Sequence, residues 1–287
     1  MSADARDLAW SAVTNETAAG VFVYGIASIA AGILDLIWRD FESAHQPIQA
    51  FGDHIPGREI LALITAVWLI AGGSAILRRS TARVGSAALA AIYLIFAVFW
   101  SPRLYTAPHA LGIRIPVYIG VLGGMGTQLI LVAAGAIVYA SRTPRVSLRV
   151  ERVLPLARWI FGLCSIDFGL SHLTGVKASS IFVPKWMPLG ADFWTIFTGI
   201  CFVLAGLAIL ARILDVMAAR LLALMLLVFS VLVLSPEPFI SPHNHVAWGA
   251  NAYNLAAVGA VWIFAETLAS RRAKPAARTS ARLAEVS

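Results

Sequence analysis

The chain has 287 residues, of which 59% are hydrophobic and only 13% are charged, and its mean hydropathy is +0.80. About a quarter of the residues of a soluble domain are charged, so a soluble fold would leave much of this apolar surface in water. The composition therefore excludes an ordinary soluble domain and indicates a membrane protein.

Eight apolar segments are each long enough, or nearly so, to cross the hydrocarbon core, which takes about 20 helical residues. They are predicted at 18–38, 60–77, 84–100, 116–140, 159–176, 193–211, 216–234 and 246–265. Helices are the only candidates, because an isolated strand cannot satisfy its backbone in lipid and the alternation typical of a β-barrel is absent. We therefore predict an all-α membrane protein with eight transmembrane helices.

The basic residues are distributed unevenly between the two sides of this topology. Sixteen of the 22 Lys and Arg residues fall in the terminal segments and in the loops on the same side as the termini, and six fall on the opposite side. The positive-inside rule then places both termini in the cytoplasm of a multi-pass protein of the bacterial inner (plasma) membrane. This distribution explains the net charge of +7 without a nucleic-acid partner.

The two halves of the chain resemble each other at a spacing of 133–137 residues. YGIASIAAGILDL (24–36) aligns with FGLCSIDFGLSHL (161–173), which puts Asp35 opposite His172, and IAGGSAIL (70–77) resembles VLAGLAIL (203–210). Because four helices return the chain to its starting side, the pattern predicts two parallel four-helix repeats. The expected domains are a first repeat over 1–141, a basic cytoplasmic linker over 142–158, a second repeat over 159–270 and a basic, disordered tail over 271–287.

The second half is similar to the DoxX-like family of membrane proteins. The resemblance covers roughly 155–265 and rests on FGLSHL (168–173), VPKWMP (183–188), FWTIFTG (193–199) and LAGLAIL (204–210). The first half departs from the pattern, with Asp35 at the histidine position and HIP (54–56) in place of the tryptophan loop. The resemblance implies a four-helix bundle for each unit, and some relatives are regarded as membrane subunits of quinone-linked sulfur oxidation.

Two ionisable residues of the fifth predicted span, Asp167 and His172, are the candidate catalytic residues. A charged group costs about 2.5–3.5 kcal/mol inside the membrane, so both are expected to face protein or water. Five positions apart, they point about 140° apart on a helix, and each needs a partner from another helix. His172 would donate a hydrogen bond or pass a proton that Asp167 holds or relays; alternatively, His172 caps or packs at the outer interface.

A ligand pocket is expected near the outer side of the second half. Trp186 would cover it, and the stripe of Trp248, Asn251 and Asn254 at three-residue spacing would form a polar wall. The candidate ligand-binding residues are thus Trp186, Trp248, Asn251, Asn254, Ser165 and Asp35. The alternatives are that the tryptophans belong to an aromatic belt and that the asparagines join helices.

Histidines are the candidate metal ligands of this sequence. All six histidines fall on or near the predicted outer side, and His243 and His245 form a His-x-His pair that can bind a metal, with His172 as a third ligand. Cys164 and Cys201 lie in apolar spans without a C-x-x-C spacing, which indicates buried structural thiols.

Three functions remain open at this stage. The first is a redox-linked subunit that binds a quinone or another lipid-soluble small molecule beside His172. The second is a transporter or lipid-handling protein, and the third is a non-catalytic assembly or scaffold protein. Membrane lipids are expected partners in each case, and a partner protein or a homo-oligomer is compatible with all three.

Overall fold

The computed structural model describes residues 3–42, 45, 56–142 and 146–286, and the side chains of 18–42, 45, 56–142 and 150–273. Most of the described residues are helical, and there is no strand among them. The helices are α1 (Ala3–Trp38), α2 (Arg58–Leu77), α3 (Ala82–Trp100), α4 (Arg103–Leu111), α5 (Ile115–Ser141), α6 (Val146–Thr174), α7 (Val176–Ser180), α8 (Ala191–Ala211), α9 (Asp215–Val228), the π-helical segment η1 (Phe229–Leu234), α10 (Glu237–Ile240) and α11 (His245–Val286).

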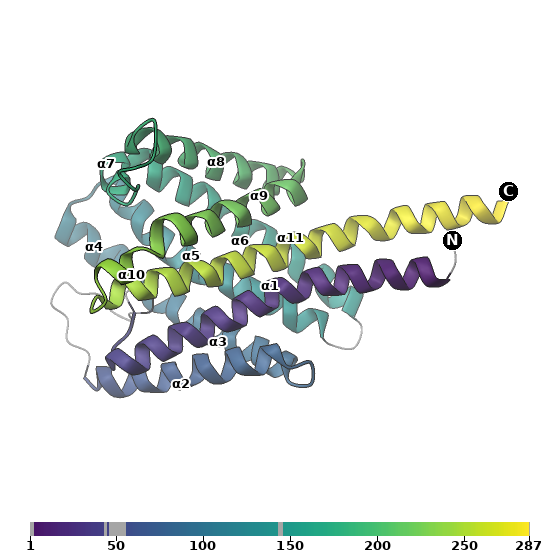
Figure 1. Cartoon of the computed structure of the whole chain (residues 1–287), viewed down its shortest axis with the longest axis horizontal. Coiled ribbons are helices and arrows are strands. Elements are labelled where there is room, and N and C mark those ends of the chain that lie inside the picture. Colours follow the sequence, from purple (N-terminus) through teal and green to yellow (C-terminus); the bar gives the residue numbers. More distant parts are fainter. Residues whose placement is uncertain (1–2, 43–44, 46–55, 143–145, 287) are drawn as a thin grey trace.

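The eight predicted spans are confirmed. Within the described ranges, eight helical segments are long and apolar enough to cross a membrane: α1 from Ala18, α2, α3, α5, α6 from Val150, α8, α9 continued through η1 to Ile240, and α11 as far as Ala273. This chain is therefore an integral membrane protein. The helix α1 begins and α11 ends at the same end of the molecule, here called the terminal end, and α4, α7 and α10 lie at the opposite end (Figure 1).

Two segments differ from the sequence-based expectation. Residues 146–158, expected as a linker, form the first turns of α6, and α11 continues as a helix to Val286 where a disordered tail was expected. The first segment is rich in Leu and Arg and the second in Ala and Arg, residues that favour helices. Ion pairs also hold α6, since Arg158 contacts Asp215 at 2.6 Å and Glu151 contacts Arg271 at 2.9 Å.

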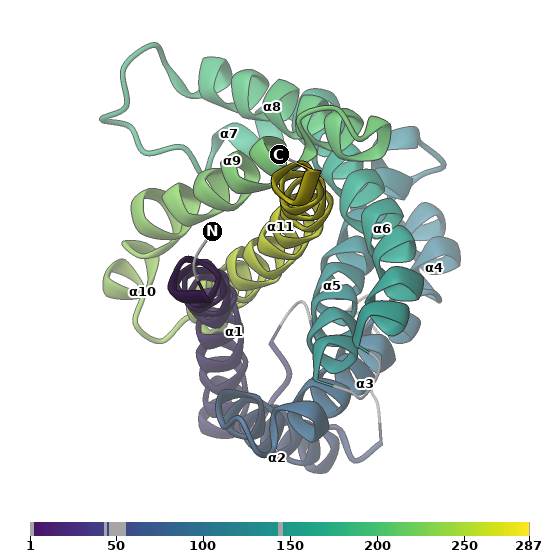
Figure 2. The ribbon, with the colours of Figure 1, turned by 90° about the vertical axis from the view of Figure 1, so that its right-hand side faces the viewer.

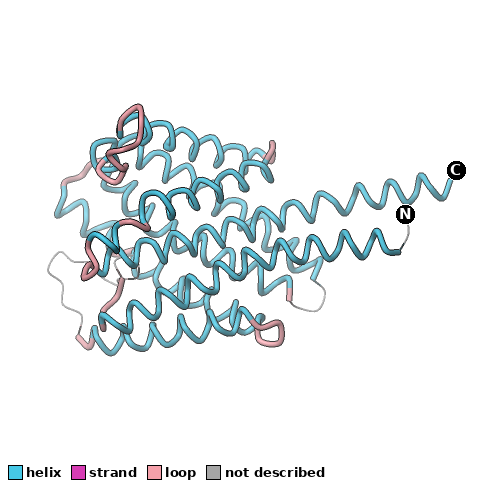
Figure 3. The backbone as a smooth tube through the Cα atoms, in the orientation of Figure 1, coloured by secondary structure: helices cyan, strands magenta, loops and turns pink. Residues whose placement is uncertain are grey.

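The spans pack in a ring rather than as two closed bundles. In chain order, α1 packs on α2, α2 on α3 and α3 on α5; α6 packs on α8, α8 on α9 and α9 on α11. The ring is joined where α5 meets α6 and where α1 meets α11, and α5 also contacts α11 across the middle. Figures 2 and 3 show the resulting all-helical assembly end-on and from the side. Each half is thus completed by a helix of the other half.

Aligned glycines make the same close helix crossing in both halves. A Cβ atom on Gly73 of α2 would lie 2.7 Å from the carbonyl oxygen of Gly25 in α1. In the second half, a Cβ atom on Gly206 of α8 would lie 2.5 Å from the carbonyl oxygen of Gly162 in α6. Small residues allow membrane helices to approach this closely, and these glycines do so in both halves.

Candidate functional site

A cavity of about 1140 Å³ lies between α6, α8, α9 with η1, and α11. It extends from Trp194, near the start of α8, to Ile213, just beyond the end of that helix. At about 1.5 Å per residue this is a length of roughly 30 Å. The volume exceeds the roughly 300–1,000 Å³ of typical small-molecule pockets. The walls are mainly aliphatic and aromatic, so the cavity suits a long apolar molecule.

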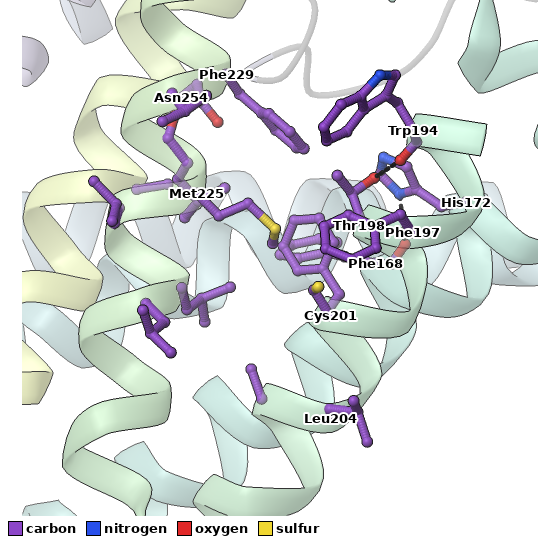
Figure 4. Close-up of a pocket in the computed structure, with 18 of the residues that line it drawn as sticks. Phe168, His172, Trp194, Phe197, Thr198, Cys201, Leu204, Met225, Phe229 and Asn254 are labelled. Carbon is purple, nitrogen blue, oxygen red and sulfur yellow. Dashed lines mark hydrogen bonds between the residues drawn. The ribbon is translucent and has the colours of Figure 1, made fainter. Parts of the chain in front are cut away.

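His172 is the imidazole that lines this cavity. It lies in the last turn of α6, where its Nδ1 is 2.9 Å from the carbonyl oxygen of Phe168. A carbonyl oxygen only accepts hydrogen bonds, so Nδ1 carries the proton and Nε2 of the neutral ring is an acceptor. The ring lies 5.4 Å from that of Phe202 and 6.4 Å from that of Phe229. Figure 4 shows His172 beside Trp194 and Thr198 on one wall of the cavity.

The facing wall is organised by the asparagines of α11 and the π-helical segment. Asn254 lines the cavity and donates from Nδ2 to the carbonyl oxygen of Leu226 at 2.7 Å and to Oγ of Ser230 at 2.8 Å. Asn251 donates to Oγ of Ser235 at 3.1 Å. The asparagines therefore do join helices, and Asn254 is both such a link and part of the cavity wall.

Cys201 lines the cavity as a half-buried free thiol, while Cys164 is buried and donates to the carbonyl oxygen of Gly126 at 3.5 Å. The expectation of two equivalent buried thiols is therefore wrong for Cys201. Hydropathy alone missed this difference because both residues lie within apolar spans, and only helix packing decides which side faces empty space.

Asp167 and His172 are not brought together. One carboxylate oxygen of Asp167 is buried against Gly123 of α5, where a Cβ atom would lie 3.0 Å away. Asp167 does not line the cavity, whereas its neighbour Phe168 and His172 do. The helical geometry had predicted this divergence, and a relay between the two side chains therefore has no direct contact to support it.

Four further predicted ligand residues do not line the cavity: Trp186, Trp248, Ser165 and Asn251. The Trp186 residue is 67% exposed and does not line the cavity; Val183 and Met187 of the same loop do. Trp248 donates to the carbonyl oxygen of Pro242, and the Ser165 hydroxyl donates within α6 to that of Phe161. The Trp186 ring is thus exposed and outside the cavity lining, and its role as a lid stays a prediction.

Asp35 belongs to a second polar cluster, in the first half. It is completely buried, and Oδ1 accepts a hydrogen bond from the backbone N–H of Glu42 at 2.9 Å. Oδ2 lies 3.6 Å from Nδ1 of His45, and Oδ1 lies 3.7 Å from Nε2 of His245. We call Asp35, Glu42, His45 and His245 the Asp35 cluster.

The cluster is held by charge and by aromatic packing. Its two imidazole–carboxylate distances exceed those of good hydrogen bonds, so the attraction is mainly electrostatic. Burial by itself lowers the pKa of His45, but the adjacent carboxylate of Asp35 and the charge of Glu42 outweigh burial and raise that pKa. The ring of His45 stacks on Phe96 at 4.5 Å and that of His245 on Trp38 at 4.8 Å.

His45 was not singled out by the sequence as a site residue. The available signal was Asp35 itself, since a buried carboxylate needs a partner from another segment. His45 supplies this partner. It follows α1 in a polar stretch, where hydrophobic periodicity does not predict which side chains point into the protein.

The predicted metal ligands are separated. Across the part of the chain that the structure describes, no three His, Cys, Asp or Glu side chains are grouped so as to hold a metal ion. His172 faces the cavity, His245 faces Asp35 and His243 is exposed. The sequence motif therefore did not bring three histidines to one point.

Comparison with known proteins gives no relative: no family model, no curated protein and no solved structure matches the chain.

Proposed function

We propose that this protein binds a lipid-soluble ligand with a polar ring, of the quinone and hydroquinone class, in the cavity beside His172. The observation that carries the proposal is an acceptor nitrogen at the end of a long apolar cavity. Ligand sites combine mostly apolar walls with a few polar groups that fix orientation. His172 supplies such a group, and the surrounding phenylalanines supply surfaces on which a flat ring can stack.

The tautomer of His172 favours binding of the reduced form of such a ligand, the hydroquinone. Because Nδ1 donates to Phe168, Nε2 of the neutral imidazole can accept a hydrogen bond from a hydroquinone hydroxyl, whereas a quinone carbonyl offers no donor. The apolar remainder of the cavity would accommodate a hydrocarbon tail along α8. A redox role within a larger enzyme is compatible with this binding mode.

The DoxX-like resemblance is consistent with the same site. The segments that carry it include Phe168, His172, Trp194 and Thr198, all of which line the cavity. We infer from this coincidence that the second half is a DoxX-like unit and that the first half is its diverged parallel duplicate, with the aligned glycine crossings as support.

A second candidate function is lipid handling, favoured by the length of the cavity. A site that extends along the whole of α8 suits an acyl chain as well as an isoprenoid tail. Phospholipid and hydroquinone would compete for the same walls, but only the hydroquinone depends on the His172 acceptor. A competition experiment therefore separates the two candidates.

Orientation in the bilayer follows from the basic residues. Arg78, Arg142 and Arg212 directly follow α2, α5 and α8, whose last residues lie at the terminal end, and we infer that this end is cytoplasmic in a bacterial inner membrane. Cysteine substitutions at Ser80 and at Ser241 would test this in cells with a membrane-impermeant thiol reagent. Labelling at position 80 but not at 241 would reverse the orientation.

The binding experiment titrates a short-chain benzoquinol into purified protein, with the tryptophan fluorescence of Trp194 as readout. We expect saturable quenching and an affinity about three- to tenfold lower in His172→Ala, the value of one neutral hydrogen bond. His109→Ala is the matched control, because His109 makes the same bond to the residue four positions earlier but is exposed and lies outside the cavity.

A second readout uses the cavity thiol. Bound benzoquinol should slow the alkylation of Cys201 by N-ethylmaleimide without changing the slow reaction of the buried Cys164. If the wild-type protein shows neither quenching nor protection, or if His172→Ala and His109→Ala behave alike, the proposed function is wrong.

A further inference from the structure

The cavity beside His172 is bordered on one side by residues that also face outward from the helices. These residues line the cavity and are between 41% and 60% exposed. On α8 and α9 they are Phe197, Leu204, Leu207, Leu221, Leu224 and Val228. We call the strip that they form between the two helices the seam. The cavity is therefore not enclosed on this side.

The seam lies within the part of the molecule that crosses the membrane. On each helix its residues are three, four or seven positions apart, a spacing that keeps side chains on one face of a helix. Both faces belong to membrane spans, Ala191–Ala211 and Asp215–Ile240. Side chains exposed at the flank of a membrane span contact hydrocarbon, so the seam connects the cavity with the interior of the bilayer.

Charged groups are gathered at the terminal end of the cavity. Asp215, the first residue of α9, is completely buried, and its two carboxylate oxygens each lie 2.6 Å from an arginine, Arg158 of α6 and Arg272 of α11. The same arginines donate to the carbonyl oxygens of Ile209 and Arg212 at 2.7 and 3.0 Å. An apolar molecule that approached from this end would meet a network of charges held by three helices.

At the opposite end a loop forms part of the cavity wall. Val183 and Met187, which lie between α7 and α8, line the cavity there. The indole N–H of Trp194 donates to the carbonyl oxygen of Pro188 at 2.7 Å and so ties this loop to the first turn of α8. Both ends are thus crossed by polar bonds, whereas the seam presents apolar side chains along its length.

The chemistry of the seam indicates which molecules can cross it. No Asp, Glu, Lys or Arg is found among the described residues that line the cavity. A molecule dissolved in hydrocarbon loses no hydration on crossing such a border, whereas a charged molecule does. We propose that ligands enter this cavity from the hydrocarbon core of the bilayer through the seam, and that a long tail stays in the seam while the ring lies beside His172. This entry route rests on the proposed function and narrows its ligands to molecules dissolved in the bilayer.

Cys201 reports on the route without any quinol, because it lines the cavity and lies three residues before Leu204 on α8 (Figure 4). Protein in phosphatidylcholine nanodiscs is treated with apolar N-cyclohexylmaleimide or with a sulfonated maleimide, and peptide mass spectrometry follows each thiol. His243→Cys supplies an exposed reference thiol. Relative to this reference, we expect the sulfonated reagent to modify Cys201 at least about tenfold more slowly than the apolar one, because its charge is excluded from the seam. Equal relative rates, or no reaction with either reagent, would overturn the route.

Leu204→Trp obstructs the seam with a larger side chain. Val67→Trp is the matched control, because Val67 of α2 is equally exposed, at 60%, on a span of the first half. We expect Leu204→Trp to slow both the apolar alkylation of Cys201 and the association of benzoquinol about fivefold, and Val67→Trp to change neither rate. Circular dichroism confirms that the helices remain.

The two experiments separate the route from the proposed ligand. If Leu204→Trp and Val67→Trp give the same rates, ligands do not enter through the seam, even where benzoquinol binds beside His172. If wild-type protein binds no benzoquinol but Leu204→Trp alone slows the apolar alkylation of Cys201, the proposed ligand is wrong and the entry route stands.

Discussion

The first half closes around Asp35, whereas the second half leaves a cavity beside His172, although the two residues occupy aligned positions. In the first half the chain after α1 turns inward and buries Phe41, Glu42 and His45. In the second half the loop that follows the corresponding helix, α6, leaves the Trp186 side chain exposed. The same helical scaffold therefore supports a charged, filled interior in one half and an apolar, open interior in the other.

The two halves also differ in the crossing between their second and third spans, α2 with α3 and α8 with α9. Gly72 of α2 and Gly85 of α3 let these helices meet closely, since a Cβ atom on Gly85 would lie 2.3 Å from the backbone nitrogen of Ile76. The position aligned with Gly72 is Ala205, which lines the large cavity, and the matching turn of α9 contains Ala218 and Ala219. The α8–α9 pair therefore carries alanines where the α2–α3 pair carries glycines, and we expect the added methyl groups to keep α8 and α9 farther apart.

The largest expected effect is the loss of unfolding free energy on substitution of Asp35, compared with substitution of His172 at the aligned position. Asp35→Ala removes the carboxylate that faces the buried imidazole of His45 and the partly buried one of His245, and loss of one partner from a buried charged pair costs about 3 kcal/mol. His172→Ala, at the aligned position beside the cavity, should change the free energy of unfolding by less than about 1 kcal/mol. Thermal and urea unfolding in detergent measure both. Equal losses would remove the contrast between the halves.

Gly85→Ala tests the helix crossing. The new methyl group would meet the backbone of α2, and we expect a loss of about 2 kcal/mol in unfolding free energy, as for other over-packed sites. Gly120→Ala, where the added carbon meets open space, is the control and should be neutral or slightly stabilising. If both variants unfold alike, the Gly72–Gly85 contact does not set the helix separation.

Ala205→Phe should make the second half resemble the first by filling its cavity. The phenyl ring would occupy space needed by a ligand, and we expect benzoquinol affinity to fall by about tenfold, or about 1.4 kcal/mol. The helical content should stay unchanged, because the ring enters empty volume. Unaltered affinity would show that the ligand does not occupy the part of the cavity beside α8.

The smallest expected effect is the pH dependence of the Asp35 cluster. The pKa of His45 is raised above 6.5 in the folded protein, so its protonation stabilises the fold. This contribution is complete below pH 6.5 and is lost as the pH rises through the folded-state pKa. His45→Gln should flatten the pH profile of thermal unfolding in this range, whereas His243→Gln, on the exposed residue, should leave the slope as it is.

The sequence predicted the membrane spans well because their signal is local: an apolar run of sufficient length needs no knowledge of its neighbours. It also identified Asp35 and His172 as interior polar positions. It could not predict that His45 reaches Asp35 or that Trp186 faces outward, because both depend on how a polar loop folds over the bundle. A pocket near the outer side of the second half was predicted, but its length and most of its lining were not, because these depend on how far apart two helices pack.

The contact between α1 and α11 has a consequence for biosynthesis. The ribosome synthesises α1 before α11, so the contact between these two helices, which completes the ring, forms only after α11 has been made. During that interval Asp35 lacks the imidazole of His245, and the cavity lacks the wall that bears Asn254. Insertion into the bilayer can proceed helix by helix, but both polar regions are assembled only after α11 has been synthesised.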